Sequence, residues 1–181
     1  LIHLHPGVEE LGRVWAPLLS ATADNSLAAL ALSQIEPDRL WHDQAKAAHE
    51  EFLAFSTPIE TVGAVNMSEV IAHLGEVLPK DAILTNGAGN FAAWLHRFHR
   101  HQARGTQLAP TSGAMGYGYP AALSAKATAP HREVVCIAGD GDFMMSANEM
   151  ATAAQYDIGA IVVVVDNGTF GTIRMHQEGH Y

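Results

Sequence analysis

The sequence is poor in residues that several classes of protein depend on. Among 181 residues there is one cysteine, Cys136, which excludes a disulfide framework and favours a reducing, cytoplasmic environment. The sequence has 10 Lys and Arg residues and 19 Asp and Glu residues, which gives a formal net charge of -9. Because nucleic acids and anionic membrane surfaces are bound by clustered basic side chains, neither is expected as a partner.

Long apolar runs are also missing. No run approaches the roughly 18 residues of a transmembrane helix, and no basic start precedes an apolar segment as in a signal peptide, so neither is predicted. The composition, 48% hydrophobic and 16% charged, suits one α/β domain or one domain with part of another. The chain begins with Leu1, which suggests a piece of a longer protein.

The most informative stretch is built around two apolar runs. Residues 134–138 and 161–165 are short and rich in β-branched side chains, as buried parallel strands are. Residues 143–156 between them carry apolar side chains at helical spacing, so the stretch predicts a strand-helix-strand crossover. A polar side chain follows each strand, Asp140 after the first and Asn167 after the second.

These two polar side chains are expected to face one small volume, because the carboxyl ends of parallel strands share one edge of a sheet, where ligands bind. A helix that starts near Asp142 would aim free N–H groups at the same place and stabilise an anion there. No Lys follows Lys126, and the nearest cation downstream of the motif is Arg174. A bound phosphate would therefore need a metal, and Mg²⁺ is suited to carboxylate and phosphate oxygens.

The sequence Gly139-Asp140-Gly141, a gap of 24 residues and then Asp166-Asn167 resemble the diphosphate-and-metal motif of thiamine-diphosphate-dependent enzymes. Asp166 departs from the usual Asn, while Asn167 keeps the ligand position. The resemblance implies Mg²⁺ held by the Asp140 carboxylate, the Asn167 amide oxygen and the Thr169 backbone carbonyl, completed by diphosphate oxygens and a water. It also implies an α/β fold, a three-layer α/β/α arrangement around a mostly parallel sheet, incomplete in this chain.

The same resemblance assigns cofactor-binding residues in glycine-rich turns. The Asp142 backbone N–H would donate to the diphosphate, and the turn after the strand predicted at residues 82–84 would let backbone approach the phosphates. Gly113 would offer its carbonyl to the aminopyrimidine ring, and Met115 would support the bent cofactor. The full set is Ala88, Gly89, Asn90, Gly113, Met115, Gly139, Asp140, Gly141, Asp142, Asn167 and Thr169.

The order of segments indicates two parts. Residues 1–56 resemble the end of the middle domain of the acetolactate synthase group together with connecting helices. Residues 57–66 are predicted as a linker, and residues 67–181 resemble a diphosphate-binding domain that we expect to be incomplete. His3 and His5 are interpreted as capping or surface residues rather than ligands.

Helix ends give further expectations. Asp24 or Asn25 is predicted to cap one helix, and Pro37 to open the next.

The HRFHRH run at 96–101 has spacing that a metal site could use. No acidic or Cys partner accompanies it, so a solvated basic helix end is the preferred interpretation.

The resemblance to acetolactate synthases implies a thiamine-diphosphate-dependent lyase or transferase that decarboxylates 2-keto acids and joins the product to a second carbonyl. The family's catalytic Glu lies in the pyrimidine-binding domain of a neighbouring subunit. We therefore expect a homodimer or homotetramer, assign no catalytic residue within this chain, and expect the chain alone to be inactive. FAD stays open as a cofactor, since its site belongs mainly to the middle domain.

Two other functions stay open. A strand followed by Asp140-x-Asp142 is also typical of phosphatases and phosphotransferases that use one Asp as nucleophile and another as acid, although such chemistry needs a downstream cation. The second alternative is a non-catalytic binding module with the same fold. The residues that would select one 2-keto acid over another are expected outside this chain.

Overall fold

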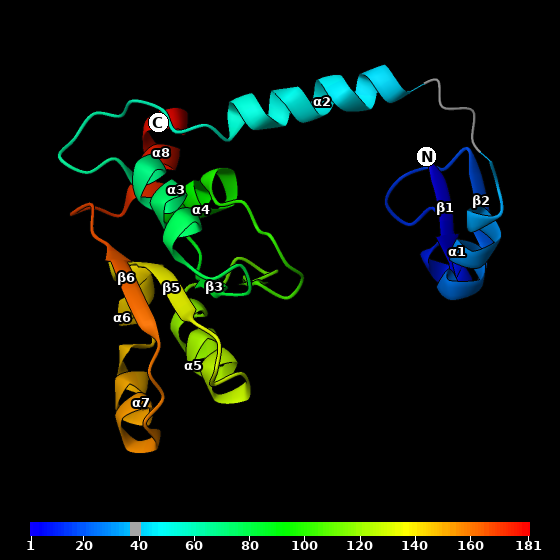
Figure 1. Ribbon diagram of the computed structural model, residues 1–181. Helices are drawn as coiled ribbons and strands as arrows, with labels where there is room; N and C mark the ends of the chain where they lie inside the picture. The colour runs from blue at the N-terminus through cyan, green and yellow to red at the C-terminus, as the bar shows by residue number, and fades with distance from the viewer. Residues whose placement is uncertain (37–40) are drawn as a thin grey trace. The chain divides into compact units, whose positions relative to one another are not determined.

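The computed structural model describes residues 1–36 and 41–181, which form two compact units, Leu1–Ala48 and His49–Tyr181 (Figure 1). The predicted helix start at Pro37 lies outside the described residues. The predicted linker and domain bounds stay predictions, since the division between the units falls inside a helix, α2 (His42–Phe55).

The smaller unit is a parallel strand pair with a short helix beside it. Ile2 pairs with Leu19 at the start of the register. The Asp24 side chain accepts the backbone N–H groups of Ser26 and Leu27 at 2.9 and 3.1 Å, so Asp24 is the cap that the sequence predicts. The elements of this unit are β1 (Ile2–His5), η1 (Val8–Glu10), β2 (Leu19–Thr22) and α1 (Asn25–Ser33).

The two histidines of β1 serve local turns. His5 Nδ1 accepts the backbone N–H of Gly7 at 3.0 Å, and His3 Nδ1 accepts that of Gly12 at 3.2 Å. In the described ranges, no group of three or more His, Cys, Asp or Glu is placed to hold a metal ion. Both rings thus make the local backbone contacts expected of capping residues.

The larger unit is built on a four-stranded parallel sheet in the order β4-β3-β5-β6. The strands are β3 (Ile83–Asn86), β4 (Gln107–Leu108), β5 (Val134–Gly139) and β6 (Ile161–Val165). The helices are α3 (Met67–Val77), α4 (Asn90–Phe98), α5 (Gly118–Thr128), α6 (Asp140–Met144), η2 (Ala147–Glu149), α7 (Met150–Tyr156) and α8 (Gly171–His180).

Side chains of β5 alternate between two helical layers. Val135 and Ile137 pack with side chains of α3 and α4, whereas Val134, Cys136 and Ala138 pack with side chains of α5. Every residue of β5 is buried, as expected for the middle strand of a parallel sheet covered on both faces. The predicted α/β architecture with helices on both faces is confirmed (Figure 1).

The prediction of one helix over residues 143–156 is wrong. α6 ends at Met144, and Ser146, with φ -135° and ψ 15°, interrupts the helix before η2 and α7. Met144 and Met150 are 72% and 56% exposed, so the apolar spacing does not correspond to one buried face. Periodicity alone cannot detect an interruption that preserves the approximate spacing of apolar residues.

β3 extends beyond its predicted end at residue 84 to include the buried polar residues Thr85 and Asn86. Thr85 Oγ1 donates to the Gly118 carbonyl at 2.8 Å, and Asn86 Nδ2 donates to the Gly87 carbonyl at 2.8 Å. A Cβ on Gly118 would lie 2.7 Å from the Gly87 nitrogen, so α5 approaches β3 this closely because the residue is glycine.

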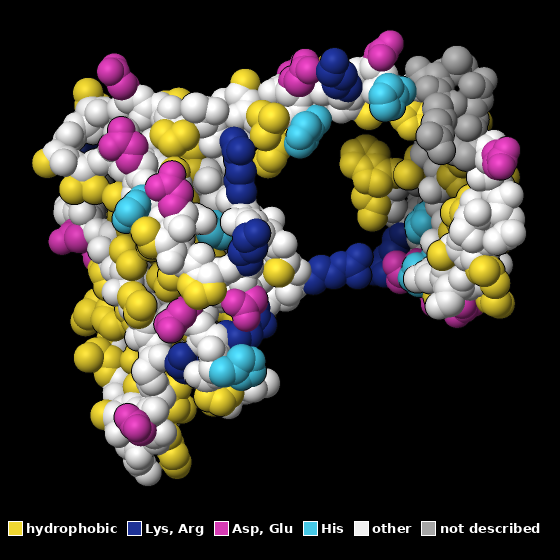
Figure 2. Space-filling model, in the orientation of Figure 1, with side chains coloured by type: hydrophobic (Ala, Val, Ile, Leu, Met, Phe, Trp, Pro, Cys, Tyr) yellow, Lys and Arg dark blue, Asp and Glu magenta, His cyan; other side chains and the backbone are white. Residues whose placement is uncertain are grey.

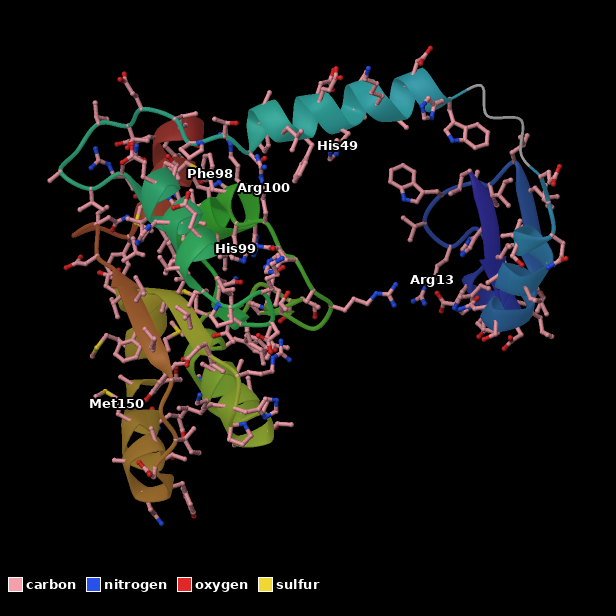
Figure 3. The ribbon with its side chains drawn as sticks, viewed as in Figure 1. Arg13, His49, Phe98, His99, Arg100 and Met150 are labelled. Atoms are coloured by element: carbon pink, nitrogen blue, oxygen red, sulfur yellow. The ribbon has the colours of Figure 1, made fainter. Side chains whose placement is uncertain are left out.

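β6 lies at an edge of the described sheet. Ile161 and Val164 are exposed, and Figure 2 shows hydrophobic side chains along the side of the larger unit formed by β6, α6 and α7. Met150, labelled in Figure 3, belongs to this surface. In residues 1–36 and 41–181 there is no helix with the length and apolar character to cross a bilayer.

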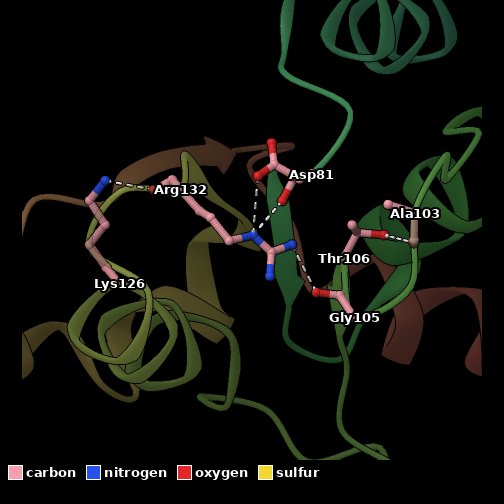
Figure 4. A network of polar contacts seen from close by, with 6 residues as sticks. All are labelled: Asp81, Ala103, Gly105, Thr106, Lys126 and Arg132. Carbon is pink, nitrogen blue, oxygen red and sulfur yellow. Dashed lines mark hydrogen bonds and ion pairs between the residues drawn. The ribbon is translucent and has the colours of Figure 1, made fainter.

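The amino ends of three strands are tied together by Arg132 (Figure 4). Its Nε donates to the Asp81 carbonyl at 2.6 Å and its Nη2 to the Gly105 carbonyl at 3.0 Å, while Lys126 Nζ donates to the Arg132 carbonyl at 2.7 Å. Asp81, Gly105 and Arg132 precede β3, β4 and β5. Arg132 therefore fixes the sheet at the edge away from the turns that follow the strands.

We predict that Arg132→Ala lowers the free energy of unfolding by about 2 to 3 kcal/mol, because bonds from a charged, mostly buried donor are lost. Urea denaturation measures this change. The control is Arg104→Ala, at an exposed position beside Gly105, where a change below about 0.5 kcal/mol is expected. Equal unfolding midpoints for both variants would show that the hydrogen bonds of Arg132 do not stabilise the sheet.

Cys136 is fully buried on β5, and burial raises the pKa of its thiol to about 11 from an ordinary value of 9.0. Since the thiolate is the reactive form, we predict that iodoacetamide labels the folded protein at pH 8 at least ~100-fold more slowly than the urea-unfolded protein. Mass spectrometry over time gives both rates. Similar rates would show that Cys136 is accessible in the folded state.

Candidate functional site

The carboxyl ends of β3 and β5 form the point at which the sheet reverses its winding. After β3 the chain runs through α4 to β4, and after β5 it runs through α6 and α7 to β6 on the other side. Side chains of α4 and α7 pack on opposite faces of the sheet. In an open parallel sheet such a point leaves a crevice between the two turns, and ligands bind there. The turns concerned are residues 87–90 and 139–142.

A cavity of about 870 Å³ lies at this place in the larger unit, a size that accepts a whole small molecule. It brings together all the predicted cofactor-binding residues except Gly113. Those lining it are Ala88, Gly89, Asn90, Met115, Gly139, Asp140, Gly141, Asp142, Asn167 and Thr169. Gly113 lies in an exposed loop at φ +68°, two residues before Met115. The roles assigned to these residues stay predictions.

One wall of the cavity carries oxygen donors of the kind that hold a hard cation. Asp140 follows β5, and Asn167 and Thr169 follow β6; because Gly139 pairs with Val165, the two turns start side by side. Asn167 Oδ1 accepts the Thr169 backbone N–H at 3.1 Å, which holds the amide within its turn. A carboxylate, an amide oxygen and a backbone carbonyl are ligand types that Mg²⁺ takes.

The start of α4, which follows the turn after β3, presents uncapped backbone N–H groups to the same cavity. α4 begins at Asn90, after Gly89 at φ 156°, and no side chain caps it. The first turn of an uncapped helix leaves N–H groups without partners, which favours an anion. A Cβ on Gly89 or on Gly139 would lie 2.8 Å from the Phe91 ring, so the ring packs this closely against both turns because these residues are glycine.

Asp142 has a feature that sequence reasoning missed. The prediction concerned its backbone N–H, but its side chain is 2% exposed, and Oδ1 accepts the backbone N–H groups of Gly116 at 2.8 Å and Ala88 at 3.2 Å. Burial raises the pKa of this carboxyl, and the two hydrogen bonds partly oppose that rise. The side chain thus joins three separate segments at the cavity.

The start of α8 is a second feature that sequence reasoning missed. Thr172 Oγ1 donates to Asn90 Oδ1 at 3.0 Å, which connects α8 with the start of α4. A Cβ on Gly171 would lie 2.9 Å from Asn167 Nδ2, so α8 packs directly against the predicted metal ligand. Gly171 is the sequence signal that could have indicated this packing, because a glycine allows another segment to approach its backbone closely.

Residues 87–181, which include the turns around the cavity, match the family model of the thiamine pyrophosphate enzyme, C-terminal TPP binding domain. The chain belongs to this family. The matched range holds Asp140 and Asn167 and excludes the smaller unit. Membership therefore agrees with the resemblance read from the Gly139-Asp140-Gly141 motif.

Relatives within the family include acetolactate synthases. The chain is similar to the acetolactate synthase large subunit of Parasynechococcus marenigrum (strain WH8102), with 29% identity over 100% of this chain and 30% of that protein. It is similar to an acetolactate synthase of Arthrospira platensis, with 40% identity over 56% of this chain and 17% of that protein. The matches thus span a third or less of the length of these relatives.

A solved structure supports the fold. The thiamine diphosphate-dependent 4-hydroxybenzoylformate decarboxylase of Rhodococcus jostii RHA1 superposes with a TM-score of 0.75, over 98% of this chain and 33% of that chain. Sequence identity is 24%, so this likeness supports the α/β fold alone.

Most of the basic run at the end of α4 is solvated as predicted, since His96, Arg100 and His101 are exposed, but His99 departs from the prediction (Figure 3). His99 is half-buried, with its ring centroid 4.6 Å from that of His101 and its Nδ1 without a hydrogen-bond partner among the described residues. Gly75 on α3 lies beside the ring, and a Cβ there would be in ordinary van der Waals contact with it, 3.7 Å from Nδ1. Burial, and then the charge of His101, lowers the pKa of His99.

This lowered pKa predicts a loss of stability in acid. In the unfolded chain this histidine is protonated as pH falls below about 6.5, whereas in the folded chain it stays neutral to a lower pH. The contribution of neutral His99 to the free energy of unfolding is therefore fully present above that pH and is lost as pH falls below it. We predict that His99→Gln reduces the difference in unfolding free energy between pH 7.5 and pH 5.5, measured by urea denaturation. Exposed His131→Gln is the control. An unchanged pH dependence in His99→Gln would contradict the assignment.

Proposed function

We propose that this chain is the thiamine-diphosphate- and Mg²⁺-binding portion of an acetolactate synthase-like enzyme that acts on 2-keto acids. One observation carries the proposal: the oxygen donors of Asp140, Asn167 and Thr169 meet the uncapped N–H groups of α4 in one cavity. This pairs a site for a hard cation with a site for an anion, as Mg²⁺ and a diphosphate require.

The charge of the cavity favours binding of the anion together with a metal. The charged residues among its described lining are Asp140, Asp142 and Asp166, all acidic. A diphosphate alone would meet these carboxylates, and the partial positive charge of a helix start is too small to offset them. Asp166, which departs from the family motif, is exposed and accepts the Gly168 N–H at 2.8 Å. This contact keeps Asp166 in its own turn beside Asn167.

The remaining lining suits the rest of such a cofactor. The lining also includes the apolar side chains of Met67, Val70, Trp94, Val163 and Val165. When bound, thiamine diphosphate supplies a nucleophilic carbon for decarboxylation of 2-keto acids and for joining the product to a second carbonyl. The role of this chain is to bind and orient the cofactor and to shield it from water. We assign it no catalytic residue, and we infer a homodimer or homotetramer whose neighbouring subunit supplies the catalytic Glu.

A phosphatase with Asp140 and Asp142 as nucleophile and acid is less well supported. A general acid must reach the leaving group. The Asp142 carboxyl is buried and engaged with the N–H groups of Ala88 and Gly116 instead. A binding module that keeps the cofactor site without turnover stays the other alternative, and activity of the full-length protein on pyruvate would exclude it.

We predict that Asp140→Asn weakens binding of thiamine diphosphate in the presence of Mg²⁺ at least ~100-fold, because a first ligand of the metal loses its charge. Isothermal titration calorimetry of the full chain measures the affinity. Asp157→Asn is the matched control, since it makes the same chemical change at an exposed carboxylate at the end of α7.

Two results would overturn this proposal. Wild-type protein that does not bind thiamine diphosphate with Mg²⁺ would exclude the cofactor, and an Asp140→Asn variant of unchanged affinity would exclude the metal site. Capture of beryllofluoride on Asp140 would instead support the phosphatase alternative.

A further inference from the structure

We propose that the Asp142 side chain is a positioning residue that holds two walls of the cavity at a set distance: the turn at 87–90 and the loop that carries Gly113 and Met115. This inference rests on the proposed function and deepens it. It concerns the carboxylate, whereas the role proposed for Asp142 above concerns its backbone N–H.

The geometry of the carboxylate is that of a crosslink. Asp142 lies in the first turn of α6, and its Oδ1 accepts the N–H of Gly116, 26 residues earlier, and that of Ala88, 54 residues earlier. The space that a Cβ on Gly87 would take is filled by the Asp142 carboxylate. Three segments that are far apart in sequence therefore meet on one oxygen.

The loop that this oxygen holds is exposed before Gly116. Residues 111–115 are exposed, and the Gly113 N–H bonds within the loop, to the Pro110 carbonyl at 3.2 Å. Gly116 at φ +79° is half-buried, and a Cβ there would lie 3.0 Å from Met145 Cβ. The bond from Gly116 to Asp142 thus fixes the end of the loop next to the cavity.

The two walls would take different parts of the proposed cofactor. The turn at 87–90, with Asp140, would face the diphosphate, whereas the loop would face the aminopyrimidine ring through Met115, which lines the cavity. A tie between the walls sets the distance between the two subsites. The tie therefore strengthens binding of a ligand that spans both subsites. It has less effect on a ligand that occupies only the diphosphate subsite.

The experiment compares the affinities of two probes, thiamine diphosphate and inorganic pyrophosphate, each titrated with Mg²⁺ into the full chain. We expect Asp142→Ala to weaken thiamine diphosphate about 10- to 100-fold while pyrophosphate changes less than about 3-fold, since the tie couples two subsites. Asp142→Asn keeps an oxygen at Oδ1 and should restore the wild-type ratio of the two affinities. Arg132→Ala is the control, because it destabilises the opposite edge of the sheet and should leave this ratio unchanged.

A second readout needs no ligand. In wild type, the Ala88 and Gly116 amides should exchange slowly with deuterated solvent, and in Asp142→Ala both should exchange at least ~10-fold faster, while Asp142→Asn keeps them slow. Arg132→Ala should not accelerate these two amides selectively.

Four outcomes would overturn the inference. Equal weakening of both probes in Asp142→Ala would make the residue part of the diphosphate subsite alone, and unchanged exchange of both amides would remove the crosslink. Wild-type protein that fails to bind thiamine diphosphate defeats the proposed function, and this inference with it. Wild type that binds, with a variant of unchanged probe ratio, defeats this inference only.

Discussion

The structure of the larger unit depends on the parallel pairing of β3 with β5. These strands are neighbours in the sheet although β4 lies between them in sequence, so the connections that follow them depart in opposite directions. That departure opens the crevice, because neither following helix covers the gap between the two turns. Burial of every residue of β5 between helical layers makes the arrangement stable, and Arg132 fixes the amino ends of the same strands.

Close contact between backbones is the second condition for the site. Gly118 approaches Gly87, and the Phe91 ring packs against Gly89 and Gly139, at distances that leave no space for a Cβ. The Gly118–Gly87 and Phe91–Gly139 contacts each bring together segments that lie far apart in sequence. The glycines permit this approach but do not fix it, since they supply no side-chain bonds. The polar contacts Thr85–Gly118 and Asp142–Gly116 fix what the glycines permit.

Electrostatics then restricts what the cavity can hold. Carboxylates and free N–H groups lie on its walls together, so neither an isolated anion nor an isolated organic cation matches the whole lining. A metal bound to an anionic group matches both parts. The apolar remainder of the lining favours an organic body attached to that anion. This combination links the fold to the proposed cofactor without a basic side chain.

The sequence by itself determined the elements whose signals are local. β5 and β6 follow from apolar runs, the cap of α1 from Asp24, and the meeting of Asp140 with Asn167 from the rule that parallel strands end at one edge. The tertiary structure decided everything that depends on residues distant in sequence. The bond from Thr172 to Asn90 joins residues 82 apart, and that from Asp142 to Ala88 joins residues 54 apart. The interruption at Ser146 and the burial of His99 against α3 likewise escaped prediction, because each is set by packing between elements, which periodicity within one element does not encode.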